Sequence, residues 1–253
     1  MKNVLIQTNK MCKSFMMGKE GVHVLRNVDL EIYEGDFTVV MGSSGSGKST
    51  LLYSISTMDK PTSGELTLFG KNAMELSEKE VAGIRKKDIS FIFQSMNLLP
   101  DLSAFENIAY CGYGAEKRSK QEINQRTEEL LKEFNLWEVR DKFPNEMSGG
   151  QQQRIAVARA MITEPKIIFG DEPTGALNSS SGKSVLNLLT EINRKGQSIV
   201  MVTHDLKAAR RASRLLYLAD GKIDGELKLG GYVEEEKEER DRIIYQFLKE
   251  RGW

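Results

Sequence analysis

Short apolar runs rich in β-branched and aromatic residues recur along this chain, separated by stretches with helical spacing. Each run has the length and composition of a buried strand. Alternation of this kind is typical of an α/β layered sheet, in which ligands bind at the carboxyl ends of the strands. The runs lie at 37–41, 66–69, 90–93, 166–169, 198–202 and 215–218.

The stretch between 95 and 163 differs from the rest, because no run in it has strand character. It contains helix starts instead: Ser103-x-x-Glu106 and Ser119-x-x-Glu122 both match the capping box, in which serine and glutamate bond each other's backbone N–H. The pattern predicts an all-helical insertion between two halves of a sheet.

Composition limits the function classes. With 253 residues the chain can bury a large core, and its 36 basic and 36 acidic residues balance, so no global charge favours nucleic acid. Cys12 and Cys111 form no metal-spaced pattern and are interpreted as reduced thiols. No apolar run approaches the ~20 residues of a membrane span, and no signal peptide is recognisable. We expect a soluble, cytoplasmic protein that reaches a membrane only through a partner.

The segment 42–50 is the strongest chemical signal. It reads G-x-x-x-x-G-K-[ST] and stands between the apolar run 37–41 and a helix that begins with Leu51-Leu52. This strand–loop–helix context is that of a P-loop, whose backbone N–H groups and helix start hold phosphates while the lysine reaches the β- and γ-phosphates and the serine ligates Mg²⁺. The expected nucleotide-binding residues are Gly42, Ser43, Ser44, Gly45, Ser46, Gly47, Lys48, Ser49 and Thr50.

Two further motifs narrow the class of P-loop protein. Residues 147–154 read Met-Ser-Gly-Gly-Gln-Gln-Gln-Arg, and the apolar strand 167–170 is followed by Asp171-Glu172. In these motifs the chain resembles the ABC ATPases, with their signature motif and Walker B strand. The resemblance implies an α/β fold of the P-loop NTPase type, with a RecA-like core built on a mixed sheet and an ABC-specific helical subdomain. It also implies hydrolysis of ATP with Mg²⁺.

The resemblance covers nearly the whole chain and implies a single ABC ATPase domain in three parts. We expect the ATP-binding core at 1–94 and 164–225, the helical subdomain at 95–163 and a C-terminal extension at 226–253. In the extension, apolar residues between 243 and 248 recur at helical spacing. A helix that packs back on the domain is the favoured interpretation, and a partner-binding helix is the alternative.

The signature residues Ser148, Gly149, Gly150 and Gln151 precede a helical pattern, so free N–H groups at a helix start again offer an anion site. In the family, the signature of one copy covers the γ-phosphate held by the other copy's P-loop. The resemblance therefore implies a dimer of this chain around two ATP molecules. A glycine-rich helix start without a ligand is the alternative.

Three polar residues after strands match the family's catalytic positions. Glu172 matches the general base that polarises the attacking water, with Asp171 as the Mg²⁺ ligand before it. Gln94 matches the glutamine that contacts Mg²⁺ and water, and His204 matches the switch histidine at the γ-phosphate. His23 has no such context and is assigned a structural role.

At two further positions the sequence leaves the role of the residue open. Phe15 lies where the family places an aromatic ring under adenine, but a core phenylalanine explains it equally well from local sequence. Asn178 stands where the family usually has aspartate in the loop that crosses the dimer interface. An amide keeps hydrogen-bonding capacity and loses the charge, so we expect hydrolysis to survive with altered coupling between the two sites.

Segments 94–100 and 104–108 resemble a branch of transporter ATPases that includes macrolide exporters, lipoprotein-releasing systems, the cell-division ATPase and bacitracin-type peptide-resistance pumps. Segments 140–146 and 171–177 are most similar to the last group. The resemblance implies a separate membrane permease that contacts the region near 94–110, and a location on the cytoplasmic face of the cell membrane. Lipoprotein release or mechanical regulation of a cell-division partner is the alternative.

Other uses of the same motifs fit the chain less well. DNA-repair ABC ATPases need a long coiled-coil insertion, and translation factors carry two such domains, so no nucleic-acid partner is expected. A scaffold that binds nucleotide without hydrolysis is disfavoured because Glu172 and His204 are both present.

Overall fold

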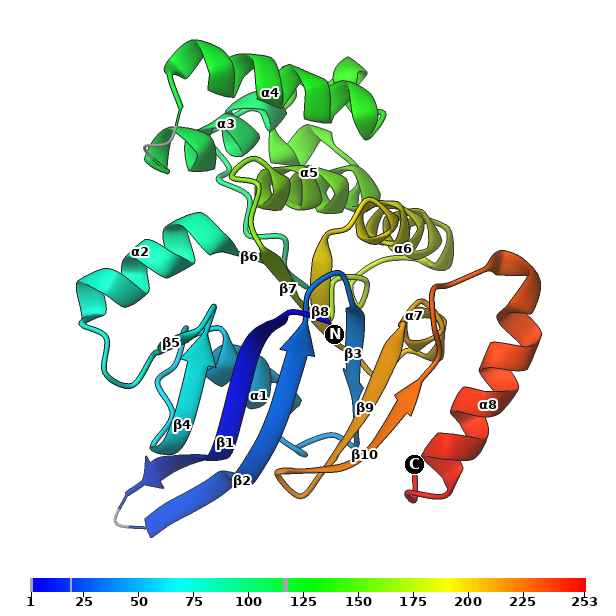
Figure 1. Cartoon of the computed structure of the whole chain (residues 1–253). Helices are drawn as coiled ribbons and strands as arrows, with labels where there is room; N and C mark the ends of the chain where they lie inside the picture. Colours follow the sequence, from blue (N-terminus) through cyan, green and yellow to red (C-terminus); the bar gives the residue numbers. More distant parts are fainter. Residues whose placement is uncertain (1, 19, 116–117) are drawn as a thin grey trace. The chain divides into compact units, whose positions relative to one another are not determined.

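The computed structural model describes residues 2–18, 20–115 and 118–253 and contains two compact units (Figure 1). Met1–Ala82 and Ile192–Trp253 form the first, here called the N/C unit, and Gly83–Glu191 form the second, the central unit. The expected division into core, helical subdomain and extension follows motifs rather than compactness and stays a prediction.

An antiparallel sheet forms the first part of the N/C unit. Its order is β2-β1-β4-β5, with the elements β1 (Val4–Met17), β2 (Glu20–Tyr33), β4 (Ser63–Leu68) and β5 (Lys71–Asn72). The long β1–β2 pair contains several register shifts, and Lys10 and Asn27 near them have positive φ angles of 45° and 48°. Such bulges bend and twist a pair of strands.

A mixed sheet forms the second part of this unit, with the order β10-β9-β3-β8. Strand β3 runs parallel to both neighbours, whereas β10 pairs antiparallel with β9. All residues of β3 and β8 are buried, as expected for strands covered on both faces. The strands are β3 (Phe37–Met41), β8 (Ser198–Val202), β9 (Arg214–Ala219) and β10 (Lys222–Lys228).

The helices of the N/C unit follow strands or end the chain. They are α1 (Lys48–Ile55), α7 (Leu206–Ala209), η3 (Glu234–Glu236) and α8 (Lys237–Lys249), while α2 (Glu78–Asp88) begins here. Helix α8 buries Ile244, Phe247 and Leu248 and leaves Ile243 41% exposed. Most of its apolar stripe therefore packs on the unit, in agreement with the favoured interpretation of the tail.

The central unit joins two parallel strands to several helices. Strand β6 (Ile89–Phe93) pairs with β7 (Ile167–Asp171), and the described residues between 95 and 163 contain helices and no strand. The remaining elements are α3 (Ala104–Gly114), α4 (Lys120–Glu133), η1 (Trp137–Val139), η2 (Pro144–Glu146), α5 (Gly149–Met161) and α6 (Ser179–Arg194). Within the part of the chain that the structure describes, no helix has the length and apolar character that a membrane crossing requires.

Both capping boxes predicted from sequence are present. At α3, Ser103 Oγ accepts a hydrogen bond from Glu106 N at 3.3 Å, and Glu106 Oε2 accepts one from Ser103 N at 2.8 Å. The pair Ser119 and Glu122 does the same at α4. The bonds from Ser103 hold the pKa of Glu106 below its usual value, so this cap is strongest when the carboxylate is ionised.

Replacing Ser103 by alanine should lower the free energy of unfolding by about 1 kcal/mol, because the first turn of α3 loses its side-chain cap. Since the folded-state pKa of Glu106 is lowered, its stabilising effect is present above the unfolded pKa and is lost as pH falls through the folded value. Urea unfolding at several pH values measures both effects. Ser103→Asn, which preserves a cap, should stay close to wild type, and equal losses in both variants would contradict the capping role.

Candidate functional site

The P-loop joins β3 to α1, and its helix start has no competing side chain. The N-cap residue of α1 is Gly47, with φ at 101°, and no side chain caps the helix. No acidic residue lies in the first turn. The start of α1 thus favours an anion, because no acidic side chain in the first turn opposes the positive end of the helix dipole.

Close packing shapes the loop itself. A Cβ atom on Gly42 would lie 2.1 Å from the backbone oxygen of Leu218, so only glycine fits there. The ammonium of Lys48 donates to the backbone oxygens of Gly42 and Ser43, each at 2.9 Å, and therefore lies across the loop. Ser46 Oγ is buried with no hydrogen-bond partner among the described residues. These features fit a loop that closes around phosphate oxygens.

His204 lies in the same unit, between β8 and α7. His204 is exposed. A hydrogen bond between its two neighbours holds the backbone there, because the N–H of Asp205 donates to Thr203 Oγ1 at 3.0 Å. Asp205 Oδ1 also caps α7 by accepting from Lys207 N at 2.8 Å. The sequence therefore fixes the backbone around His204, which is exposed.

Phe15 lies on β1 and is 41% exposed. Its interpretation as a core residue is therefore wrong, and a surface role is left. The ammonium of Lys13 lies 4.9 Å from the ring centroid and is held by Asp59 at 2.5 Å and by the backbone oxygen of Lys60 at 2.7 Å. A buried cation thus stabilises the orientation of an exposed ring.

In the central unit, Gln94 and Glu172 converge on Gly175. A Cβ atom placed on Gly175 would lie 2.9 Å from Gln94 Nε2 and 3.3 Å from Glu172 Oε2. Asp171 ends β7 and is paired in register with Phe93, the last residue of β6. Glu172 has a φ angle of 45°, a conformation that costs a non-glycine residue energy and is concentrated at functional sites.

Helix α5 holds the segment after β6, and sequence reasoning missed the residues that do so. Arg159 donates to the backbone oxygens of Met96 and Asn97, both at 2.6 Å, and Gln153 Nε2 donates to that of Phe93 at 3.2 Å. Burial lowers the pKa of the Arg159 guanidinium. They have no distinct sequence signal, because α5 contains three other polar residues. Hydrogen bonds from α5, the helix that begins with the signature, thus hold the backbone on both sides of Gln94.

The signature forms the start of α5. Ser148 Oγ accepts from Gln151 N at 3.3 Å, and Gln151 Oε1 accepts from Ser148 N at 2.9 Å. This is the same box as at α3 and α4, but glutamine replaces glutamate. A Cβ atom on Gly150 would lie 2.7 Å from Ser181 Oγ, so a small residue is required. Helix α5 is therefore capped without any acidic residue in its first turn.

Asn178 caps the next helix, α6. Its Oδ1 accepts from Ser181 N and from Ser180 Oγ, each at 2.9 Å. Asparagine and aspartate cap helices about equally well, so the departure from the family pattern preserves the cap and removes only the charge.

The described residues contain no group of three His, Cys, Asp or Glu side chains that could hold a metal ion. Mg²⁺ does not require such a group, because it is usually bound through one or two carboxylates together with phosphate oxygens and water.

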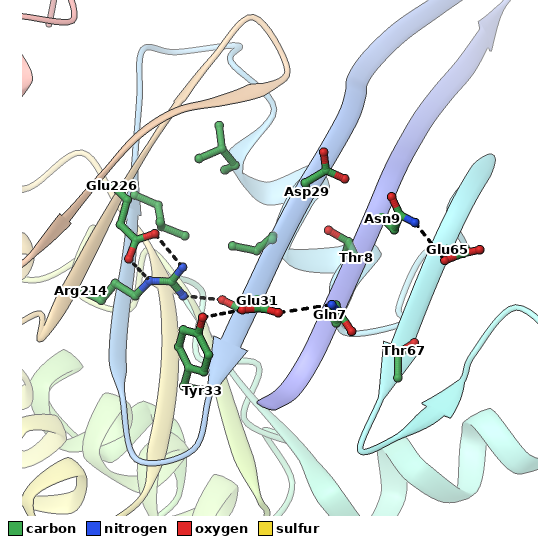
Figure 2. A pocket seen from close by; sticks show the side chains of 13 residues that line it. Gln7, Thr8, Asn9, Asp29, Glu31, Tyr33, Glu65, Thr67, Arg214 and Glu226 are labelled. Atoms are coloured by element: carbon green, nitrogen blue, oxygen red, sulfur yellow. Dashed lines mark hydrogen bonds and ion pairs between the residues drawn. The ribbon is translucent and has the colours of Figure 1, made fainter. Parts of the chain in front are cut away.

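A cavity of about 480 Å³ lies elsewhere in the N/C unit (Figure 2). Arg214 forms a two-point ion pair with Glu226 at 2.9 and 3.0 Å, and the hydroxyl of Tyr33 donates to Glu31 at 2.5 Å. These bonds lower the pKa of Glu226 and raise that of Tyr33. Because four carboxylates and a single guanidinium line it, this cavity repels a triphosphate and is not the nucleotide site.

Comparison with known proteins agrees with the motifs. The family described as ABC transporter matches residues 25–175. An uncharacterised ABC transporter ATP-binding protein of Methanocaldococcus jannaschii, MJ0796, is 42% identical over 237 residues, which are 90% of this chain and 99% of that protein. The chain belongs to the ABC transporter ATP-binding family. It is an ABC ATPase domain.

Solved structures give the same family. The dimeric structure of MJ0796, bound to ADP and Pi in a post-hydrolysis state, has a TM-score of 0.81 and covers 90% of this chain and all of its own. The macrolide export ATP-binding/permease protein MacB of Escherichia coli is 44% identical over 220 residues, 87% of this chain. The chain spans only 34% of MacB.

Gln151→Glu should leave the fold of this ATPase intact and weaken its response to ATP. Glutamate preserves the box, as it does at α3 and α4, but places a negative charge where a phosphate is expected. Like charges brought together at an interface cost several kcal/mol, so ATP-dependent association should weaken by about tenfold or more. Light scattering with and without ATP measures it.

Gln121→Glu is the matched control, because it adds the same charge to the first turn of α4. Nucleotide binding to the P-loop should be unchanged in both variants. An ATP response in Gln151→Glu equal to that of Gln121→Glu would show that no phosphate approaches the start of α5.

Proposed function

We propose that this ATPase is the energy-supplying subunit of an ABC transporter, in which two copies associate on ATP and drive a separate membrane permease. One observation carries the proposal: α1 follows Gly47, α5 begins with Gly149 and Gly150, and neither helix has an acidic side chain in its first turn. A single triphosphate needs only one P-loop, so the second helix start serves the nucleotide of another copy.

Each motif then has a defined task. The amides of the P-loop and Lys48 bind the β- and γ-phosphates, and Ser148 with Gly149 and Gly150 covers the γ-phosphate of the partner copy. When bound, Mg²⁺ neutralises charge that develops between the β- and γ-phosphates. Ser49, Asp171 and Gln94 are the proposed ligands, directly or through water.

Hydrolysis needs a positioned water and a proton acceptor. Glu172 accepts a proton as the water oxygen bonds to the γ-phosphorus and the bond to the ADP oxygen breaks. His204 contacts the γ-phosphate and, with Gln94, orients the water. The left-handed backbone at Glu172 supports this role, since strain of this kind is retained where function requires a fixed orientation.

Phe15 is proposed to stack on the adenine ring. Its exposed ring supports this role, and stacking contributes about 1–3 kcal/mol without reading the base edges. Asn178 is proposed to alter the coupling between the two nucleotide sites, because it lacks the negative charge usual at that position.

The transported cargo is inferred from similarity alone. MacB is named as a macrolide exporter, and segment 140–146 favours a role in resistance to antimicrobial peptides. Leu99 and Tyr110, which are 42% and 60% exposed, give the region near 94–110 an apolar surface suited to a permease. The chain would then act at the cytoplasmic face of the membrane. Lipoprotein release or regulation of a cell-division partner is the second candidate.

Glu172→Gln should reduce phosphate release at least ~100-fold, since a general base typically contributes 10²–10⁴-fold, and should leave ATP binding intact. With hydrolysis blocked, the variant should accumulate as an ATP-bound dimer. A phosphate-release assay together with size-exclusion chromatography in ATP checks both points. Turnover at the wild-type rate would remove Glu172 from the mechanism, and a monomer in saturating ATP would contradict the proposed dimer.

Affinity purification of the full chain from membranes should recover an integral membrane permease, and the yield should fall when Leu99 and Tyr110 are both changed to serine. A recovered permease with a large extracellular domain would support the handling of peptides or lipoproteins. Recovery that is unaffected by the double variant would contradict the proposed permease surface.

A further inference from the structure

The C-terminal helix α8 is joined to the helix that follows His204. Figure 1 shows α8 as the last element of the chain, on the N/C unit with α7, β9 and β10. Its residue Arg240 is 3% exposed, so its charged guanidinium is almost fully removed from solvent. A buried guanidinium is costly unless nearly all of its N–H groups are bonded.

Five backbone oxygens meet that requirement. Arg240 Nε donates to Arg210 O at 3.1 Å, and Nη2 donates to Ala212 O, where the chain leaves α7. The other three acceptors lie in the segment that leads to α8: they are the backbone oxygens of Leu229 at 2.9 Å, Gly230 at 3.3 Å and Gly231 at 3.2 Å. Arg240 thus fastens the end of α7 to the segment that precedes its own helix.

A second tie lies beside the first. Asp241, next to Arg240 on α8, accepts from Arg210 Nε at 2.6 Å and pairs with the Nη2 of the same guanidinium. Arg211 stacks on the ring of Tyr232 at 4.2 Å. Both residues that follow α7 are therefore held by elements from the last part of the chain.

These ties matter because α7 is too short to hold itself. It has four residues, and isolated helices much below about 12 residues are marginal in water. Asp205, its N-cap, is covalently attached to His204. A shift of α7 therefore moves the histidine directly.

We propose that α8 positions His204 for hydrolysis by fixing α7 through Arg240 and Asp241. Arg240 is a positioning residue, because it acts through α7 and touches no nucleotide. The proposal rests on the proposed role of His204 at the γ-phosphate. It gives the C-terminal helix a positioning role in hydrolysis, in addition to its packing on the N/C unit.

Arg240→Lys in the full chain is the main test. Lysine keeps the charge but can bond fewer of the five oxygens, so α7 loses part of its support. The turnover number should fall about tenfold, since a misplacement of 1 Å can cost up to 10²-fold, while nucleotide affinity stays within about twofold. Asp241→Asn, which perturbs only the second tie, should change the same quantities less and provides a test if the lysine variant folds poorly.

Arg251→Met is the matched control. Arg251 also follows α8, but it donates to Phe247 O at 2.9 Å and lies against Asp224 on β10, away from α7. It should lower stability without lowering turnover. If Arg251→Met reduces turnover as much as Arg240→Lys at equal loss of stability, the effect is general destabilisation and the proposal is wrong.

Imidazole NMR reads the position of His204 without hydrolysis, because the chain has only two histidines. In Arg240→Lys the Cε1–H signal of His204 should shift or broaden. The signal of His23, a residue of β2 that is hydrogen-bonded to Ser14 of β1, should not change. An unchanged His204 signal overturns the positioning role. His204→Ala separates the two proposals: full activity in that variant overturns the role of His204 itself, whatever Arg240→Lys does to the signal.

Discussion

The N–H groups at the first turn of an α-helix have no partner within the helix, and the properties of this molecule depend on how they are used. At α3 and α4, a serine and a glutamate bond them and place a negative charge there. At α1 no side chain does so, and at α5 a neutral glutamine takes the place of the glutamate. Of these four helices, α1 and α5 carry no negative charge at the start, and these are the two at which the motifs predict phosphate.

The surrounding structure serves to hold these helix starts and the reactive side chains in place. Strand β3 is buried at every position and leads directly into the P-loop, where Leu218 of β9 leaves no room for a side chain on Gly42. In the central unit, α5 is tied through Arg159 to the segment after β6, so the signature helix and the segment of Gln94 move together. Rigid elements thus carry the groups that must meet the nucleotide.

Sequence patterns predicted the elements whose signals are local. The parallel strands were recognisable because burial on both faces requires continuous apolar runs, and the caps at Ser103 and Ser119 because a box has fixed spacing. The β1–β2 pair was missed, since its bulges interrupt the alternation of buried and exposed residues that identifies a half-buried strand. The ties made by Arg159 and Arg240 were missed as well, because their partners are backbone oxygens distant in sequence, which leave no residue pattern.

The site motifs were recognisable for a different reason. A P-loop, a signature and a Walker B strand require particular residue types at fixed spacing, so they survive in sequence even where the surrounding structure is not predictable. Phe15 shows the limit of that reasoning: its neighbours in sequence allowed a core position or a surface position equally, and only its exposure excluded the core.

The central claim is that each copy's P-loop works with the other copy's signature, and mixing two inactive variants tests it most directly. Lys48→Met disables the P-loop, and Ser148→Arg disables the signature. In a mixed dimer, one site combines an intact P-loop with an intact signature. The account predicts that the mixture hydrolyses ATP faster than either variant alone, and a mixture as inactive as its components would contradict it.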